Sequence, residues 1–266
     1  MSHNKTNMYD IEPHIAEIYD QTDTYSDDVE LIRKLIGNRR PLRILEPFCG
    51  TGRILIPLAV DGHEVVGLDQ AKGMLDRASM KIRELPEQVR NRISLHEADV
   101  ITDEWPISFD LVVLGGNCLY ELATAEEQEE CIIRAFDSLR TGGYIYLDNN
   151  HMEGTLHETW QRLDVDEKAF PAGTCKDGTC IQTQRKTIWF DINQRLVRYR
   201  RCTIITFVDG NAKKQEYLMQ CHPPSKVEVQ TWLEKSGFTV KQVYGDRSGN
   251  PYNEKAPRAI FWAKKK

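Results

Sequence analysis

Residues 43–59 read RILEPFCGTGRILIPLA. A short apolar run ends in the carboxylate of Glu46, a turn of small residues with Gly50 and Gly52 follows, and an apolar segment suited to a helix closes the stretch. A strand, a glycine turn and a helix in this order form a corner where backbone approaches a ligand closely and helix N–H groups are free to bind it. The stretch therefore predicts a nucleotide-binding corner.

The first 150 residues alternate between strands and helices. Apolar residues at helical spacing between 13 and 37 predict N-terminal helices, interrupted by a polar loop at 19–28 that carries Tyr19 and Tyr25. Five apolar runs predict strands, at 43–48, 64–68, 93–96, 109–114 and 144–148. The helices between them are expected at 52–60, 71–85 and 125–139. This alternation predicts a doubly wound α/β sheet, because parallel strands need helical crossovers.

The pattern changes after residue 150. Residues 180–221 hold three long β-rich runs without helices between them, which predicts an antiparallel meander. Asp177-Gly178 is a turn signal, and we expect it to place Cys175 and Cys180 opposite each other on neighbouring strands. From Ser225 the α/β pattern resumes, with a helix that stops at Gly237 and strands at 238–244 and 259–263.

Composition excludes several classes of protein. The net charge of −5 over 266 residues does not favour nucleic acid as the main partner, since such proteins carry a concentrated basic face. No run approaches the roughly 18 apolar residues of a membrane span, and the polar N-terminus does not resemble a signal peptide, so we expect a cytoplasmic protein without membrane contact. The seven cysteines lack the close pairs of a zinc site, and no metal is expected.

Two nucleotides compete for the corner. A dinucleotide requires a third glycine that lets the helix pack on the strand, and Leu55 occupies that position. S-Adenosylmethionine has no pyrophosphate, and instead needs carboxylates for its ribose hydroxyls and adenine amine. Asp69 and Asp99 follow successive strands at the sheet edge where such sheets bind ligands, and Val100 offers its backbone N–H to adenine. These residues favour S-adenosylmethionine over NAD.

Five segments in order resemble the motifs of class I S-adenosylmethionine-dependent methyltransferases of the small-molecule type: ILEPFCGTGR, VVGLDQAKGMLDRA, HEADV, FDLVVLGGN and LRTGGYIYLDN. The resemblance covers about residues 10–150 and 224–266. It implies a Rossmann-like, seven-stranded, mostly parallel sheet whose last strand is antiparallel, with the meander as an insertion. One departure is Phe48, which stands where the family usually has glycine.

The resemblance also implies which residues hold the cofactor. Glu46 and the turn with Cys49, Gly50 and Gly52 correspond to the methionine part, Asp69 to the ribose, and Gln70 and Met74 to its flank. Asp99 and Val100 correspond to adenine, and Asn117 to the sulfonium end. We expect Tyr19 beside the cofactor, and the ring of Phe48 against its methionine portion or the substrate.

The acceptor is expected to be a small molecule, methylated at nitrogen or oxygen by in-line displacement from the sulfonium. Candidate catalytic residues are Tyr25, Asn117 and His222, with Tyr120 and His151 as further possibilities. Arg198, Arg200 and Arg201 either bind a substrate carboxylate or form the solvated face of a strand. The string EPFCGTG also resembles amino-group nucleic-acid methyltransferases, although the proline pair of their next motif is missing from GNCLY at 116–120.

The expected organisation has two parts. Residues 1–149 and 223–266 form the cofactor-binding domain with a helical lid at its N-terminus, and residues 150–222 form a β cap that binds substrate. Two alternatives remain open at this point, a nucleic-acid amino-methyltransferase and a non-catalytic module that binds S-adenosylmethionine. The sequence is also compatible with either a monomer or a homodimer.

Overall fold

The computed structural model describes residues 8–10, 12–38 and 41–266. Its main element is a seven-stranded sheet in the order β10-β11-β5-β4-β1-β2-β3, in which only β11 runs antiparallel to its neighbours. The strands are β1 (Arg43–Pro47), β2 (Glu64–Asp69), β3 (Ile93–Glu97), β4 (Phe109–Leu114), β5 (Leu139–Asn150), β10 (Phe238–Tyr244) and β11 (Arg258–Lys265). This arrangement confirms the predicted doubly wound, mostly parallel sheet with an antiparallel last strand.

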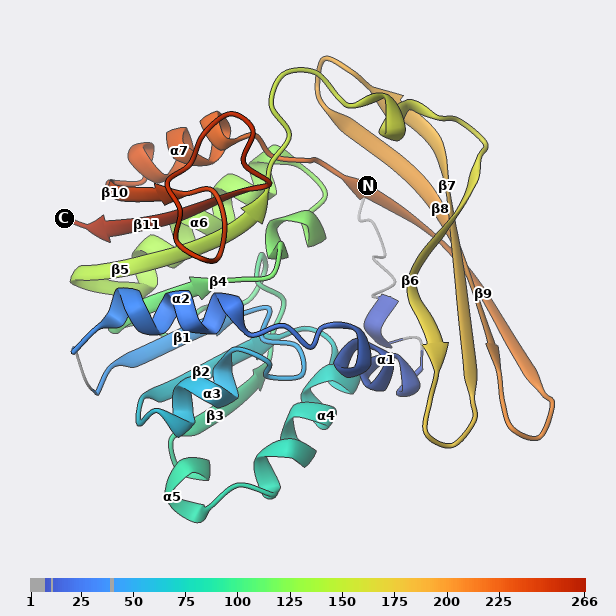
Figure 1. The fold of residues 1–266 in the computed structure, drawn as a ribbon, viewed down its shortest axis with the longest axis horizontal. Helices are drawn as coiled ribbons and strands as arrows, with labels where there is room; N and C mark the ends of the chain where they lie inside the picture. Colours follow the sequence, from blue (N-terminus) through green and yellow to red (C-terminus); the bar gives the residue numbers. More distant parts are fainter. Residues whose placement is uncertain (1–7, 11, 39–40) are drawn as a thin grey trace.

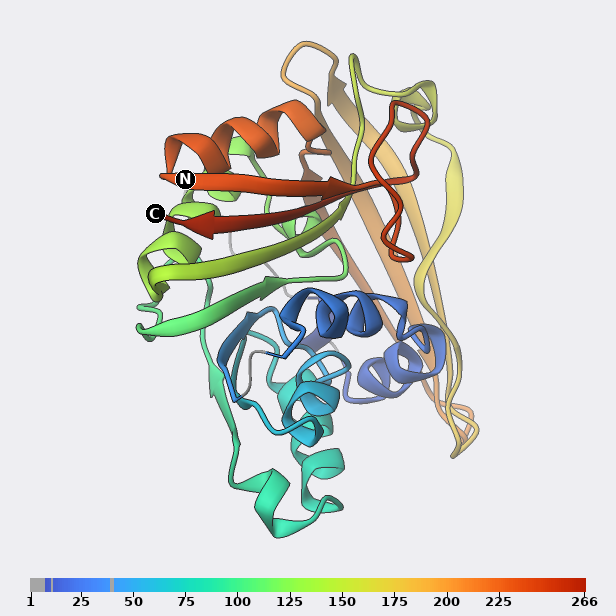
Figure 2. The same cartoon turned by 60° about the vertical axis from the view of Figure 1, so that its left-hand side comes forward.

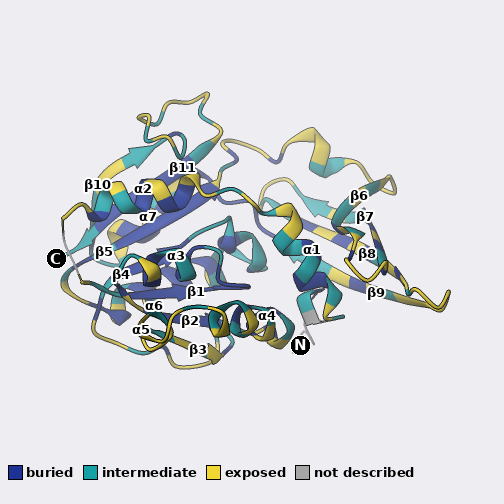
Figure 3. Ribbon diagram, turned by 60° about the horizontal axis from the view of Figure 1, so that its bottom comes forward, coloured by how far each residue is buried: buried dark blue, intermediate teal, exposed yellow. Residues whose placement is uncertain are grey.

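Helices cover both faces of the sheet, which explains the nearly continuous apolar runs of its strands. On β1, Leu45 joins a core shared with α6 (Ala125–Ser138) and α7 (Lys226–Lys235). Its neighbour Ile44 faces the opposite core, formed with α2 (Asp27–Ile36), α3 (Leu55–Val60) and α4 (Lys72–Arg83). The short α5 (Glu87–Arg90) follows α4. Figure 3 shows the buried residues concentrated along the central strands.

The insertion is a four-stranded antiparallel sheet in the order β6-β7-β8-β9. Its strands are β6 (Asp166–Thr174), β7 (Cys180–Asp191), β8 (Leu196–Thr206) and β9 (Ala212–Cys221). It stands beside the carboxyl ends of the parallel strands, as two views agree (Figures 1 and 2). The helix α1 (His14–Thr22) fills the space between the two sheets and packs Ile15 and Ile18 against the meander. Three short 3₁₀ segments complete the described chain: η1 (Met8–Asp10), η2 (Cys118–Glu121) and η3 (Glu158–Gln161).

Several predicted local features were wrong. Tyr19 lies on α1 and not in a loop, because its ring packs edge-on against Tyr9 and Phe170 and extends the helix to Thr22. The strand β6 was missed, and its register places Thr174, not Cys175, opposite Cys180. All seven cysteines are free. None of the described helices is long and apolar enough to span a membrane.

The helix α3 packs closely on the sheet, although it has Leu55 where a dinucleotide-binding helix would have glycine. A Cβ on Gly67 of β2 would lie 2.7 Å from Cys49 Sγ and 2.8 Å from Leu55 Cδ1. The strand therefore supplies the glycine that permits close packing, while Leu55 fills the space above it. The helix itself begins at Leu55 rather than near Gly52, after a turn at 51–54.

Candidate active site

A cavity of about 870 Å³ opens at the carboxyl edge of the parallel strands. Its walls come from four places: the ends of β1, β2 and β4, the N-terminal segment with α1, the linker between β5 and β6, and the meander. Ten of the predicted site residues line it, namely Tyr19, Glu46, Phe48, Cys49, Gly50, Asp69, Gln70, Met74, Val100 and Asn117. The fold thus gathers side chains from positions 19 to 117 around one space.

Among the cavity residues, the buried acid Glu46 lies near the partly buried guanidinium of Arg53. Glu46 is 6% exposed, and its Oε2 has no hydrogen-bond partner. Burial raises the pKa of this carboxyl well above its usual range, and the Arg53 guanidinium opposes the shift. Arg53 is itself held in place, with Nη1 and Nη2 donating to the two oxygens of Asp28 at 2.9 and 2.7 Å, and its buried Nε lacks a partner.

The turn after β1 has three residues in the left-handed region: Phe48 at φ +60°, Gly50 at +54° and Gly52 at +79°. For a residue with a Cβ this conformation costs about 1–2 kcal/mol, which explains why glycine suits the position of Phe48. Gly50 lines the cavity, and a Cβ there would crowd Met74 Cε at 3.3 Å. Gly52 shapes the turn but does not line the cavity.

Asp69, at the end of β2, lines the cavity, whereas Asp99, after β3, does not. Asp69 fastens the glycine turn, because its Oδ2 accepts from the Gly50 N–H at 2.7 Å and its Oδ1 from the Ala71 N–H at 2.8 Å. The Oδ1 of Asp99 caps the following turn by accepting from the N–H groups of Ile101 and Thr102. Val100, next in the chain, does reach the cavity wall.

The three predicted catalytic residues are not brought together. Asn117 lines the cavity, and its Oδ1 accepts from the Asn150 N–H at 2.6 Å and from Arg258 Nη2 at 2.9 Å. Tyr25 lies outside the cavity lining, with its ring between the guanidinium groups of Arg53 and Arg247 at 4.0 and 4.2 Å. Tyr25 therefore braces Arg53, and the expectation that it faces a substrate is not met.

His222 also requires a correction. It is 2% exposed and does not line the cavity. Its Nδ1 lies 2.8 Å from Gln128 Oε1 and its Nε2 lies 3.3 Å from Glu228 Oε1, so both ring nitrogens are engaged. The residue joins the end of β9 to α6 and α7. A histidine held in this way positions the meander and cannot contact an acceptor in the cavity.

Comparisons with known proteins agree with this architecture. Residues 44–143 match a family model described as a methyltransferase domain. A protein of Geobacillus sp. (strain WCH70), assigned provisionally as a methyltransferase, is 25% identical over 246 residues, which cover 91% of this chain and 92% of that protein. The chain therefore contains a methyltransferase domain, and its fold is that of S-adenosylmethionine-dependent methyltransferases.

Solved structures show the same fold as this methyltransferase. An S-adenosylmethionine-dependent methyltransferase from Clostridium acetobutylicum ATCC 824 superposes with a TM-score of 0.70 at 15% identity, over 94% of this chain and 97% of its own. A sugar N-methyltransferase from Streptoalloteichus sp ATCC 53650 has a TM-score of 0.69 at 16% identity, over 100% and 99% of the two chains. The agreement over whole chains includes the inserted meander.

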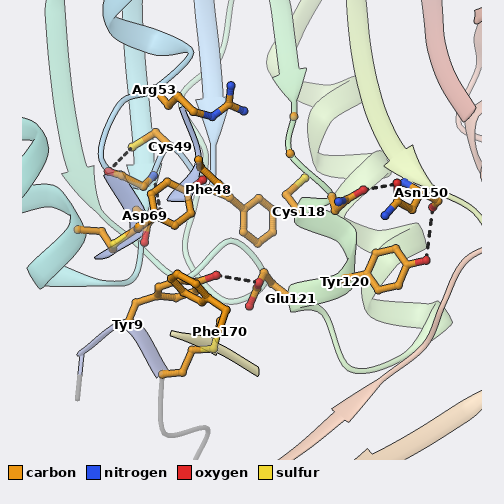
Figure 4. A pocket seen from close by; sticks show the side chains of 18 of the residues that line it. Tyr9, Phe48, Cys49, Arg53, Asp69, Cys118, Tyr120, Glu121, Asn150 and Phe170 are labelled. Carbon is orange, nitrogen blue, oxygen red and sulfur yellow. Dashed lines mark hydrogen bonds between the residues drawn. The ribbon is translucent and has the colours of Figure 1, made fainter. Parts of the chain in front are cut away.

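The methyltransferase cavity contains residues that the sequence did not single out. Arg53 directly follows the glycine turn, and this adjacency was the available signal. Glu121 and Tyr9 meet across the cavity, with Tyr9 Oη donating to Glu121 Oε1 at 3.2 Å (Figure 4). Arg201 is 9% exposed and lines the cavity, so its binding of a substrate carboxylate stays a prediction, whereas Arg198 and Arg200 are exposed on β8.

His151, weighed beside His222 from the sequence, lies in the linker between β5 and β6 and lines the cavity, as does His157. Its Nε2 lies 3.3 Å from Tyr252 Oη, and its buried Nδ1 has no hydrogen-bond partner. Burial lowers the pKa of the ring, which keeps it neutral near pH 7. Among the residues that the structure describes, no group of histidine, cysteine or acidic side chains is arranged to hold a metal ion.

Proposed function

We propose that this methyltransferase transfers the methyl group of S-adenosylmethionine to a small-molecule acceptor, at nitrogen or oxygen, inside the cavity between the two sheets. The observation that carries the proposal is the origin of the walls: the sheet edge forms one side, and the N-terminal segment, the linker and the meander form the other. Ligand pockets span about 300–1,000 Å³, and a volume of about 870 Å³ suits a cofactor together with a compact acceptor.

The donor set at the sheet edge fits the cofactor. The unpartnered oxygen of Glu46 suits the α-ammonium group, and the partner-free Nε of Arg53, beside Tyr19, suits the α-carboxylate. This arrangement matches a zwitterionic amino acid, because the protein charges are buried and opposite. Bound in this way, the cofactor supplies an activated methyl group on a positively charged sulfur.

Other residues of the proposed cofactor site are assigned to the ribose, the adenine and the sulfonium. Asp69 is suited to the ribose hydroxyls while it holds the Gly50 turn, and Gln70, Met74 and Val100 line the same side. We assign Asn117 and Phe48 to the sulfonium end. Asp99 contributes by shaping the turn that presents Val100. With Gly52, it supports the site without forming its wall.

The proposal gives the acceptor the remaining half of the cavity. Residues 150–222 act as the substrate-binding cap, and residues 1–149 and 223–266 hold the cofactor. Trp160 of η3 and Tyr120 of η2 line this half with ring centroids 6.4 Å apart. His151, neutral and with a partner-free nitrogen, is suited to take a proton from an acceptor that arrives protonated. Walls from the sheet edge, the linker and the meander argue against duplex nucleic acid, whose target base would have to leave its stack.

A turnover assay with methyl-labelled S-adenosylmethionine tests the proposal. The wild-type protein is incubated with a library of small amines, phenols and thiols, and release of S-adenosylhomocysteine is measured. We expect release with a subset of amines or phenols. Replacing Trp160 by alanine should lower that turnover by about tenfold or more, since it removes an aromatic contact of the acceptor half.

The matched control is Trp189→Ala, since Trp189 is 38% exposed on β7 and outside the cavity lining. It should leave turnover unchanged. Labelled cofactor that is bound but never consumed with any library member would instead favour a non-catalytic binding module. Methylation of DNA or RNA oligonucleotides, with no transfer to small molecules, would favour the nucleic-acid alternative.

A further inference from the structure

A further acid, Glu121, lines the cavity besides Glu46 and Asp69. Glu121 is the last residue of η2, which follows β4 directly after Asn117, and its carboxylate points into the cavity (Figure 4). Burial raises the pKa of this carboxyl, with the nearby Arg201 charge opposing the shift. It accepts a hydrogen bond from a neutral donor, the hydroxyl of Tyr9, at 3.2 Å.

The charge on Glu121 is not matched by an ion pair. Within residues 8–10, 12–38 and 41–266, no lysine, arginine or histidine forms a salt bridge with it. Arg201, the nearest source of opposite charge, is directed elsewhere: its Nη1 donates to the Phe170 carbonyl at 3.1 Å and contacts Met8 Sδ. A partly buried carboxylate without an ion pair costs free energy, and carboxylates perturbed by burial cluster at functional sites.

Aromatic rings surround the same part of the cavity. Tyr9 and Phe170 lie with ring centroids 6.1 Å apart on the side of the N-terminal segment and meander, and Tyr120 precedes Glu121 in η2. The faces of such rings attract a positive charge. A carboxylate flanked by rings is therefore suited to a nitrogen that is cationic, or becomes so.

We infer that the acceptor is an amine and that Glu121 binds its nitrogen. The inference rests on the proposed function and narrows it from nitrogen or oxygen to nitrogen. The neutral amine donates an N–H to Glu121, and its lone pair forms the new N–C bond while the pair of the breaking C–S bond passes to sulfur. Positive charge moves from sulfur to nitrogen in this step, and the methylated ammonium then releases one proton to solvent.

A carboxylate without an ion pair at position 121 is suited to this reaction. A carboxylate aimed at the nitrogen stabilises positive charge where it develops, and more strongly than in water because Glu121 is largely removed from solvent. A hydroxyl acceptor would gain less, since its oxygen must lose a proton and would approach a carboxylate as it becomes electron-rich. Glu121 should therefore discriminate between amines and alcohols of the same shape.

Binding to the full-length protein saturated with S-adenosylhomocysteine tests this inference. The probes are matched pairs: benzylamine and benzyl alcohol, cyclohexylamine and cyclohexanol, glucosamine and glucose. We expect at least one amine to bind about tenfold or more tightly than its alcohol, as a charge-assisted hydrogen bond provides. Glu121→Gln should reduce that preference to about threefold or less. Its affinity for S-adenosylhomocysteine, measured by calorimetry, should stay unchanged.

Two further variants keep the result unambiguous. Tyr9→Phe removes the neutral donor but leaves the carboxylate, so it should retain the amine preference. Glu130→Gln removes an acid of α6 that is 44% exposed and should match wild type. Equal binding of amines and alcohols in the wild type, or an undiminished preference in Glu121→Gln, would overturn the inference. Failure of the wild type to bind S-adenosylhomocysteine would contradict the cofactor site instead.

Discussion

At the scale of single residues, Glu46 shows how a binding site is maintained at the expense of stability. Its carboxylate is buried, and one of its oxygens has no partner in the described structure. Since burial raises its folded-state pKa above that of the unfolded chain, ionising the group costs folding free energy. The cost is absent at low pH and appears as pH rises above the unfolded value near 4.5.

Replacing Glu46 by glutamine should therefore stabilise the ligand-free protein at pH 7 by about 1–3 kcal/mol, the range for a buried unsatisfied polar group. The gain should shrink below about pH 4.5, where the wild-type carboxyl is also neutral. S-Adenosylmethionine should bind the variant more weakly. Urea unfolding and calorimetry measure the two effects. Glu64→Gln, at an exposed residue of β2, is the control, and a less stable Glu46→Gln would contradict the account.

Some residues of the cavity could be predicted from the sequence and others could not. Glu46, Asp69 and Gly50 were predictable as cavity residues, because open α/β sheets bind ligands at the carboxyl ends of their strands. Glu121 was not, because one acid in CLYE carries no pattern, and only the folded chain brings Tyr9 to it across 112 positions. Gly67 escaped notice for the same reason, since its packing role depends on Leu55 from another element.

At the scale of elements, a polar clamp joins the meander to the helices of the sheet domain. His222 follows β9, Gln128 lies on α6, and Glu228 lies in the first turn of α7. Glu228 also forms a capping box with Ser225, whose N–H and hydroxyl both donate to Oε2 at 2.7 Å. These contacts fix the end of the inserted segment beside the cavity.

The clamp predicts a specific pH dependence. Although burial opposes it, hydrogen bonding to His222 and Ser225 lowers the pKa of Glu228 to about 2 from an ordinary value of 4.5. Because this pKa is depressed, the stabilisation is full above about pH 4.5 and is lost as pH falls toward 2. Glu228→Gln, which still allows capping, should lower stability at pH 7, and its difference from wild type should narrow over that interval.

Urea denaturation of both proteins at several pH values would measure this difference. Glu234→Gln, exposed on the same helix, should show no such convergence. A constant gap between wild type and Glu228→Gln from pH 7 to pH 2 would mean that the carboxylate charge has no part in the clamp.

The limits of helices and strands were predicted correctly where the hydrophobic pattern was strong. They were wrong where contacts between distant residues determine the structure. The apolar run of β4 was predicted at its observed limits, Phe109–Leu114. By contrast, the polar composition of residues 19–22 suggested a loop, yet α1 continues through them because Asp20 bonds to Thr51, Arg77 and Lys81. Charge contacts with distant residues cannot be seen in a local pattern.

At the scale of the whole molecule, three segments far apart in the sequence enclose one space. The sheet edge supplies the proposed cofactor site, the insertion supplies the opposite wall, and the N-terminal segment lies between them (Figure 1). The sheet, its antiparallel last strand and the meander were predictable from the motifs and their spacing. The position of the meander over the sheet edge was not, because it depends on the apolar contacts of α1 with β7, β8 and β9.

Calorimetric titration with S-adenosylhomocysteine tests the central claim most directly, since it asks whether the Glu46–Asp69 edge of the cavity is the cofactor site. We predict micromolar-range binding to wild type, a loss of about tenfold or more for Asp69→Ala, as expected when a charged hydrogen-bonding group is removed, and wild-type affinity for Asp76→Ala, whose side chain is 63% exposed on α4. Absence of S-adenosylhomocysteine binding together with binding of NADH, or equal affinity of Asp69→Ala and wild type, would contradict it.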